Sequence, residues 1–148
     1  MDSTIRNKII DLLHEHRIMT VARNRPDGWP QATTVGYVSD GLTLYLLCGT
    51  QSQKAQNLVR DNRLSLAIAH VVTDPMAIEG LSRAARAYPV GDRAEMSRML
   101  EVLVIKHPEY AAFPKPKPEE ILIFRVVPEV ISVLDYSKGF GHTDLVTL

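Results

Sequence analysis

One segment, residues 43–58, constrains the fold of this chain most, because it predicts an apolar strand that turns directly into a helix. The run Leu44-Tyr45-Leu46-Leu47 has the composition of a buried strand, and Gly49 interrupts it. Thr50 and Gln53 have the spacing of a capping box, in which a hydroxyl and an amide satisfy backbone donors at each other's positions. A helix is therefore expected to begin immediately after Gly49.

The start of this expected helix carries an unusual charge. Lys54 lies in or beside the first turn, where the helix dipole makes a cation mildly unfavourable. An anion would remove the conflict, because free amides, the hydroxyl groups of Thr50 and Ser52 and one ammonium group are the components of a phosphate site. The alternative is that Lys54 points into water, at a cost of roughly a few tenths of a kcal/mol. These residues alone leave both interpretations open.

Length and charge limit the chain to a few classes of protein. The 148 residues suit one domain, spanning residues 1–148, and 17 basic residues balance 17 acidic ones, which disfavours a nucleic-acid partner. His14 and His16 stand at positions i and i+2 of an expected first helix and do not share a helix face. No metal site is therefore expected.

The compartment follows from the N-terminus and the single cysteine. Residues 1–17 are charged and lack an apolar core segment, and no uncharged run approaches the roughly 20 residues of a membrane span. Cys48 stands alone in an apolar strand, which favours a buried thiol in a reducing compartment. We expect a cytoplasmic protein without a membrane partner.

Apolar residues at alternating or helical spacing assign most of the chain to six strands and three helices. The expected strands cover residues 18–22, 30–38, 44–47, 63–71, 76–88 and 121–134, and the expected helices follow Ser3 or Thr4, follow Gly49 and cover residues 91–107. Pro128 predicts a bulge or an edge in the last strand. Antiparallel strands of this number usually close on themselves. We expect a mainly β (α+β) chain that forms a six-stranded antiparallel barrel with its helices outside.

At this point the chain resembles the pyridoxamine 5'-phosphate oxidase-like family of FMN-binding split barrels. The resemblance covers most of the chain and rests on the order and spacing of short fragments. After an N-terminal helix, these fragments are residues 20–23, 26–30, 31–37, 44–46, 52–54, 57–58 and 62–66. The resemblance implies a split β-barrel and a homodimer with two FMN sites at the subunit interface.

Position by position, the resemblance assigns three groups of residues to FMN. The strand that runs beside the isoalloxazine ring contains Thr33, Thr34 and Val35. The ribityl and phosphate region corresponds to Cys48, Gly49 and Thr50. The residues that hold the phosphate correspond to Ser52, Gln53 and Lys54.

Two departures from the family pattern bear on the reaction. Gln53 stands where the vitamin B6 oxidase has a basic residue, and residues 144–148 lack the oxidase's C-terminal arginine motif for the substrate phosphate. We therefore do not expect pyridoxamine phosphate oxidation. The expected activity is a flavin-dependent reductase that takes electrons from NAD(P)H to a small-molecule acceptor, with no assigned catalytic residue. Because the chain has no nucleotide-binding glycine fingerprint, NAD(P)H would bind transiently at the flavin face.

Residues 135–142 have two interpretations. Glycines alternate there with an aromatic residue and two possible cations, as expected of a flap over the flavin. Phe140 would then stack on the ring, and Lys138 or His142 would orient an anionic substrate. The alternative is a mobile tail.

Two other functions remain open at this stage. One is a flavin or haem module without turnover, in which a histidine such as His70 or His142 would ligate haem. The other is a reductase that uses the deazaflavin F420, whose longer anionic tail needs further cations. The candidates for these cations are Arg23, Arg25, Arg60 and Arg63.

Overall fold

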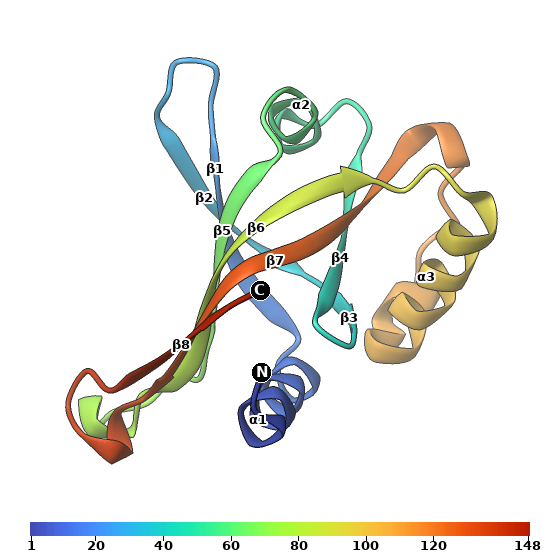
Figure 1. Ribbon diagram of the computed structural model, residues 1–148. Coiled ribbons are helices and arrows are strands. Elements are labelled where there is room, and N and C mark those ends of the chain that lie inside the picture. Colours follow the sequence, from blue (N-terminus) through green and yellow to red (C-terminus); the bar gives the residue numbers. More distant parts are fainter.

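The strands form one antiparallel sheet that curls into a split barrel (Figure 1). The computed structural model describes residues 1–148. The strands are β1 (Ile18–Asn24), β2 (Pro30–Gly36), β3 (Val38–Asp40), β4 (Thr43–Gly49), β5 (Arg63–Ala69), β6 (Glu79–Pro89), β7 (Ile121–Asp135) and β8 (Thr143–Thr147). Their order across the sheet is β2-β1-β5-β6-β7-β4-β3, and β8 pairs with β7. The predicted antiparallel split barrel is confirmed, but it has eight strands rather than six.

The additional strands arise at Tyr37 and at the C-terminus. The predicted strand 30–38 is divided, because Tyr37 leaves the ladder and joins the two edge strands β2 and β3. Tyr37 is fully buried; its hydroxyl donates to the Leu13 carbonyl (2.8 Å), and its own carbonyl lies 2.9 Å from Nε2 of His107. One anchored residue therefore carries the chain from one edge of the curled sheet to the other.

Strand β7 is the longest and pairs along both of its edges. One edge pairs with β6, and the other pairs first with β4 and then with β8. The register against β6 shifts where Ala84 faces Val130 and Ala85 faces Pro128, so Glu129 is the extra residue of a bulge. The bulge predicted at Pro128 is thus confirmed, and it bends the strand where its second partner changes.

The helices lie at the rim and on the outside of the barrel (Figure 1). They are α1 (Ser3–Glu15), α2 (Gln53–Arg60) and α3 (Arg93–Lys106), with short 3₁₀ turns η1 (Pro75–Ala77), η2 (Pro108–Ala112), η3 (Pro118–Glu120) and η4 (Tyr136–Lys138). The N-cap of α1 is Asp2, whose carboxylate accepts from the amide of Thr4, and not Ser3 or Thr4 as expected. A carboxylate one position earlier satisfies the same free amides.

Helix α2 begins slightly later than the sequence predicts. Its N-cap is Ser52, whose Oγ accepts from the amide of Ala55 (3.1 Å), so the expected capping box of Thr50 and Gln53 is wrong. The Thr50 hydroxyl donates to the carbonyl of Glu119 (2.9 Å) instead. Lys54 nevertheless lies in the first turn, as predicted.

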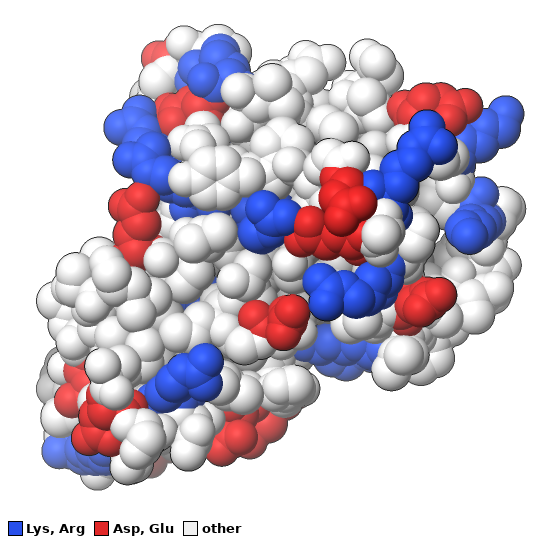
Figure 2. Space-filling view, turned by 45° about the vertical axis from the view of Figure 1, so that its right-hand side comes forward, with Lys and Arg blue, Asp and Glu red and all other residues white.

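Two apolar clusters hold these elements together. The larger one fills the barrel with side chains from α1, α2 and the strands, and it includes Phe124 and Cys48. The smaller one packs α3 against the outside of the sheet through Val38, Tyr45, Val90, Met99 and Ile123. Figure 2 shows basic and acidic side chains interspersed over one face of the molecule. All helices are too short or too polar to cross a membrane.

Candidate functional site

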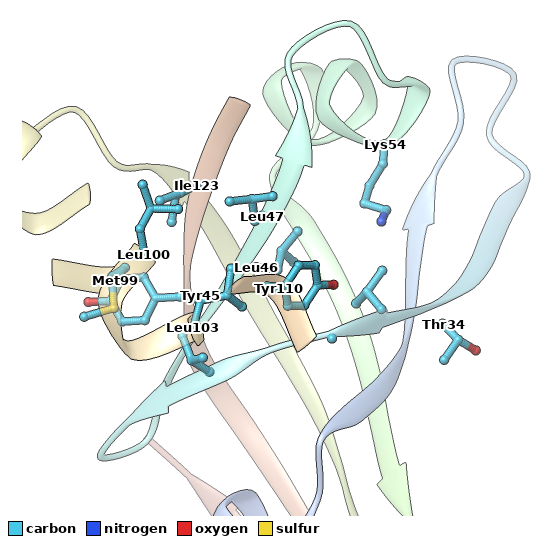
Figure 3. A pocket seen from close by; sticks show the side chains of 13 residues that line it. Thr34, Tyr45, Leu46, Leu47, Lys54, Met99, Leu100, Leu103, Tyr110 and Ile123 are labelled. Carbon is cyan, nitrogen blue, oxygen red and sulfur yellow. The ribbon is translucent and has the colours of Figure 1, made fainter. Parts of the chain in front are cut away.

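A cleft of about 270 Å³ lies between the sheet, α3 and η2 (Figure 3). Its walls are mostly apolar and come from β2, β3, β4, α3, η2 and β7. The lining residues are Thr34, Val35, Gly36, Val38, Tyr45, Leu46, Leu47, Lys54, Met99, Leu100, Leu103, Tyr110 and Ile123. Lys54 is the only charged residue among them, so the cleft combines an apolar surface with one cation.

Lys54 reaches the cleft from the N-terminus of α2 (Figure 3). The side chain is partly buried and makes neither a hydrogen bond nor an ion pair. Burial lowers the pKa of Lys54, and the neighbouring guanidinium of Arg23 lowers it further. The amides of Gln53 and Lys54 precede the first capped amide of the helix, that of Ala55, and belong to the free donors of this helix start. Positive charge is therefore concentrated here without a counter-ion.

Arg23, on β1, is the second cation of this group. It is 4% exposed, and its guanidinium donates to Oγ1 of Thr33 (2.9 Å) and Oε1 of Gln31 (3.4 Å), which are both neutral. Its Nε has no partner, and no carboxylate pairs with it. Burial lowers the pKa of Arg23. A buried cation normally has an anionic partner, and neither Arg23 nor Lys54 has one within the chain.

Strand alternation divides the residues predicted to lie beside the ring. Thr33 and Val35 pair with Val21 and Met19, on the face of the sheet that Arg23 also occupies. Thr34 is exposed on the opposite face, and its side chain points away from the cleft (Figure 3). Thr34 thus offers only its backbone to the cleft.

The residues predicted for the ribityl and phosphate region lie in the turn between β4 and α2. Cys48 is buried in the barrel core, and burial raises the pKa of its thiol to about 11. The hydroxyl protons of Thr50 and Ser52 are used on the carbonyls of Glu119 and Gly49. A hydroxyl has only one proton to donate, so the hydroxyls of Thr50 and Ser52 stabilise the turn and have no proton left for a ligand. The Lys54 ammonium group and the first amides of α2 remain free to donate.

Gln53, the residue before Lys54, does not line the apolar cleft. Its side-chain amide donates to Oδ1 of Asn57 (2.8 Å), and the residue lines a separate hollow of about 370 Å³. This hollow lies between the β1–β2 turn and α2 and is lined by Arg25, Pro26, Asp27, Gln31 and Gln53. Gln53 and Lys54 are adjacent in sequence but line different hollows.

The C-terminal residues predicted to form a flap lie away from the cleft. Phe140 is exposed and packs edge-on against Tyr136, with ring centroids 5.7 Å apart, and His142 lies 3.4 Å from the Asp144 carboxylate. Lys138 ends η4 in the same turn. This turn joins β7 to β8 at the end of β7 opposite Ile123 (Figure 1). No flap over the cleft forms within one chain.

Sequence reasoning missed several residues of the site. Arg23 enters the sequence-based predictions only as one of four cations for a longer cofactor, although its position in alternation with Met19 and Val21 directs it inward. Tyr110 and the cleft-facing side of α3, including Leu103, carried no signal beyond ordinary helix packing.

The site meets the basic chemical requirements of FMN. A phosphate dianion needs cationic and amide donors, which Arg23, Lys54 and the α2 N-terminus provide. A planar aromatic ring system needs an apolar slot with a few polar backbone groups, which the cleft walls provide. The residues present therefore fit the cofactor.

Comparisons with known proteins identify the family and the fold of the chain. The family of pyridoxamine 5'-phosphate oxidase matches residues 5–134. A conserved hypothetical protein from Mycobacterium tuberculosis is 25% identical, with a TM-score of 0.77 and coverage of 97% of this chain and 91% of that one. No curated protein matches the chain.

Two further solved structures share the fold at lower identity. A heme-binding protein from Mycobacterium smegmatis has a TM-score of 0.79 and 19% identity, with coverage of 99% of this chain and 59% of that one. An F420 reductase has a TM-score of 0.64 and 22% identity, with coverage of 82% and 94%. These similarities establish a shared fold, and the names show that this fold serves different cofactors.

Proposed function

The chain belongs to the pyridoxamine 5'-phosphate oxidase family, and we propose that it binds FMN and acts as a flavin-dependent oxidoreductase. In this proposal residues 1–148 form one FMN-binding domain of a cytoplasmic homodimer. Electrons pass from NAD(P)H to a small-molecule acceptor. When bound, FMN supplies hydride or electron transfer at its N5 atom.

The observation that carries the proposal is Lys54, which lines an apolar cleft without an ionic partner and has the buried guanidinium of Arg23 as a neighbour. Arg23 and Lys54 would hold the phosphate together with the first amides of α2. Val35, Leu47 and Tyr110 would line the ring, and backbone groups at Thr34 would orient its polar edge. The protein's contribution is binding, orientation and exclusion of water.

The size of the cleft supports a dimeric site. At about 270 Å³, the cleft of one chain lies just below the range of roughly 300–1,000 Å³ typical of small-molecule sites. FMN is large for such a space. A second subunit that closes the open side would complete the site, in agreement with the resemblance to the dimeric split barrels.

The other two cofactors are supported less well by the side chains. Three of the four arginines considered for F420 are already engaged: Arg25 pairs with Asp27, Arg63 pairs with Asp61, and Arg60 donates to the Asn24 carbonyl. Neither His70 nor His142 lines the cleft. One free cation pair and an apolar slot suit FMN better than a longer anionic tail or a haem.

Titration with FMN, followed by absorbance and flavin fluorescence, tests the proposal. Wild type is expected to bind at micromolar or lower Kd, and Lys54→Ala is expected to weaken binding about tenfold or more, the effect of one charge-assisted contact. Lys115→Ala, which removes a lysine of the exposed connector, is the matched control and should bind as wild type does. Absence of flavin binding, or equal Kd values for wild type and Lys54→Ala, would contradict the proposal.

A further inference from the structure

Three side chains of types that can bind a metal come together from two distant segments, at the C-terminus of α1 and just after β5. Glu15 is the last residue of α1, His16 follows it as the C-cap, and His70 follows the end of β5. One ligand atom from each of the three lies within 4.8 Å of the others. None of these residues lines the cleft, so the cluster is separate from the proposed flavin site.

His16 has the arrangement of a metal ligand whose ring is already oriented. Its Nδ1 lies 2.7 Å from the carbonyl oxygen of Leu12. A carbonyl can only accept, so Nδ1 carries the proton and a neutral ring keeps a lone pair on Nε2. This Nε2 is buried and has no hydrogen-bond partner. Histidines that bind metals commonly donate their other N–H to a backbone carbonyl in this way.

The other two side chains are exposed and free to adjust. The ring of His70 lies against that of His16, with centroids 4.1 Å apart, and its Nε2 is 3.8 Å from a carboxylate oxygen of Glu15. Small rotations of these two side chains would bring all three ligand atoms to one ion. The C-terminus of α1, where the helix dipole favours positive charge, lies at the same place.

We propose that Glu15, His16 and His70 bind a divalent transition-metal ion of the kind that favours imidazole, such as Zn²⁺. Two histidines and one carboxylate leave a fourth position of a tetrahedral ion for water. The ion would connect the C-terminus of α1 to the end of β5. The sequence does not predict this site. His14 and His16 are the histidines that lie close together in sequence, whereas His70 lies far along the chain.

Zinc binding to the full chain without an affinity tag tests the site. After treatment with a chelator and its removal, titration calorimetry with Zn²⁺ alone should give one ion per chain. His70→Ala should weaken the affinity at least tenfold, and Glu15→Gln should weaken it to a smaller extent. His14→Ala, which removes a neighbouring exposed histidine, is the control and should bind as wild type does.

Thermal unfolding provides a second readout that does not depend on any activity. Zn²⁺ should raise the Tm of wild type and His14→Ala but not that of His70→Ala, because an ion that binds only the folded state stabilises it. Since His70 is exposed, its removal should leave the Tm without metal unchanged. The proposal is wrong if wild type shows no saturable binding or if His70→Ala binds as tightly as wild type.

Discussion

Arg125 on β7 and Arg23 on β1 show two contrasting uses of a cation in the same sheet. The guanidinium of Arg125 donates to both carboxylate oxygens of Glu95, which also accepts from the hydroxyl of Tyr45 (3.0 Å). Arg23 is more deeply buried and has only Thr33 and Gln31 as partners. The first cation is neutralised by the protein, and the second is not.

The pKa values express the same contrast. The Arg125 guanidinium holds the pKa of Glu95 below its usual range, whereas burial lowers the pKa of both Arg23 and Lys54. A protein that keeps a buried and a partly buried positive group together without an acid bears a cost in stability. An anionic ligand would offset this cost. Four predictions test the comparison, from the largest expected effect to the smallest.

The double variant Arg23→Met/Lys54→Met removes both unpaired cations. FMN binding should weaken at least about 100-fold, because two charge-assisted contacts are lost and each contributes about 1.5–3 kcal/mol. Fluorescence titration measures the Kd. Arg125→Met removes the same charge from the paired site and should leave the Kd close to that of wild type. A similar loss in both variants would show that overall charge, rather than this site, governs binding.

The Arg83→Met variant tests whether a buried arginine without a carboxylate partner lowers stability. Arg83 does not line the cleft, so its removal does not change the proposed binding site. Arg83 is 1% exposed, donates to the Leu42 carbonyl and has two nitrogens without a partner; burial lowers its pKa to about 10. Removing this charge should raise the free energy of unfolding by about 1–3 kcal/mol, as when buried charges are replaced by apolar groups. Urea unfolding measures it. A less stable variant would indicate that Arg83 is needed by the fold.

The Glu95→Gln variant removes the carboxylate charge that pairs with Arg125. The Tm at pH 7 should fall by a few degrees, since Arg125 loses its counter-charge while Tyr45 can keep a hydrogen bond. Because the folded pKa of Glu95 is lowered, its contribution is present above the ordinary value of 4.5 and is lost as the pH falls below it. Calorimetric scans from pH 7 to pH 3 should show the two Tm values converging. A constant difference would contradict the ion pair.

The Lys106→Met variant removes an ammonium group whose contacts are a backbone carbonyl and an aromatic ring. Lys106 donates to the Leu13 carbonyl (2.9 Å) and lies over the ring of Tyr37, and burial lowers its pKa to about 8. Between this pKa and the ordinary 10.5 the unfolded chain binds more protons, so this contribution to wild-type stability rises with pH. The variant should therefore be slightly more stable at pH 7, and urea unfolding should show the advantage disappearing by about pH 10.5. An advantage that does not change with pH would contradict the lowered pKa.

Local patterns were sufficient to predict much of the fold. The strand and helix around Gly49, the position of Lys54 and the bulge at Pro128 follow from residues close in sequence, and the structure contains all three. Thr50 was assigned as the cap because its spacing to Gln53 was suitable. Its hydroxyl instead donates to Glu119, a partner that only the folded chain brings near.

The parts that could not be predicted depend on contacts between distant residues. Strand β8 is short and polar at both ends, and it forms because β7 offers a free edge beyond its bulge. Alternation shows that Arg23 points inward, but only the closed sheet shows that no acid faces it. The site assignments carried over from the family, from Thr33 to Lys54, remain predictions that FMN titration of the variants will test.

The position of β7 in the sheet also bears on the biosynthesis of this protein. Residues 121–135 supply partners for β4, β6 and β8, and Ile123 forms part of the cleft wall. While the chain is being translated, β4 and β6 therefore each keep one unpaired edge until residues 121–135 have been made. The part of the cleft wall that contains Ile123 is likewise formed only then. A nascent chain that stops before residue 121 would present two open strand edges to its neighbours.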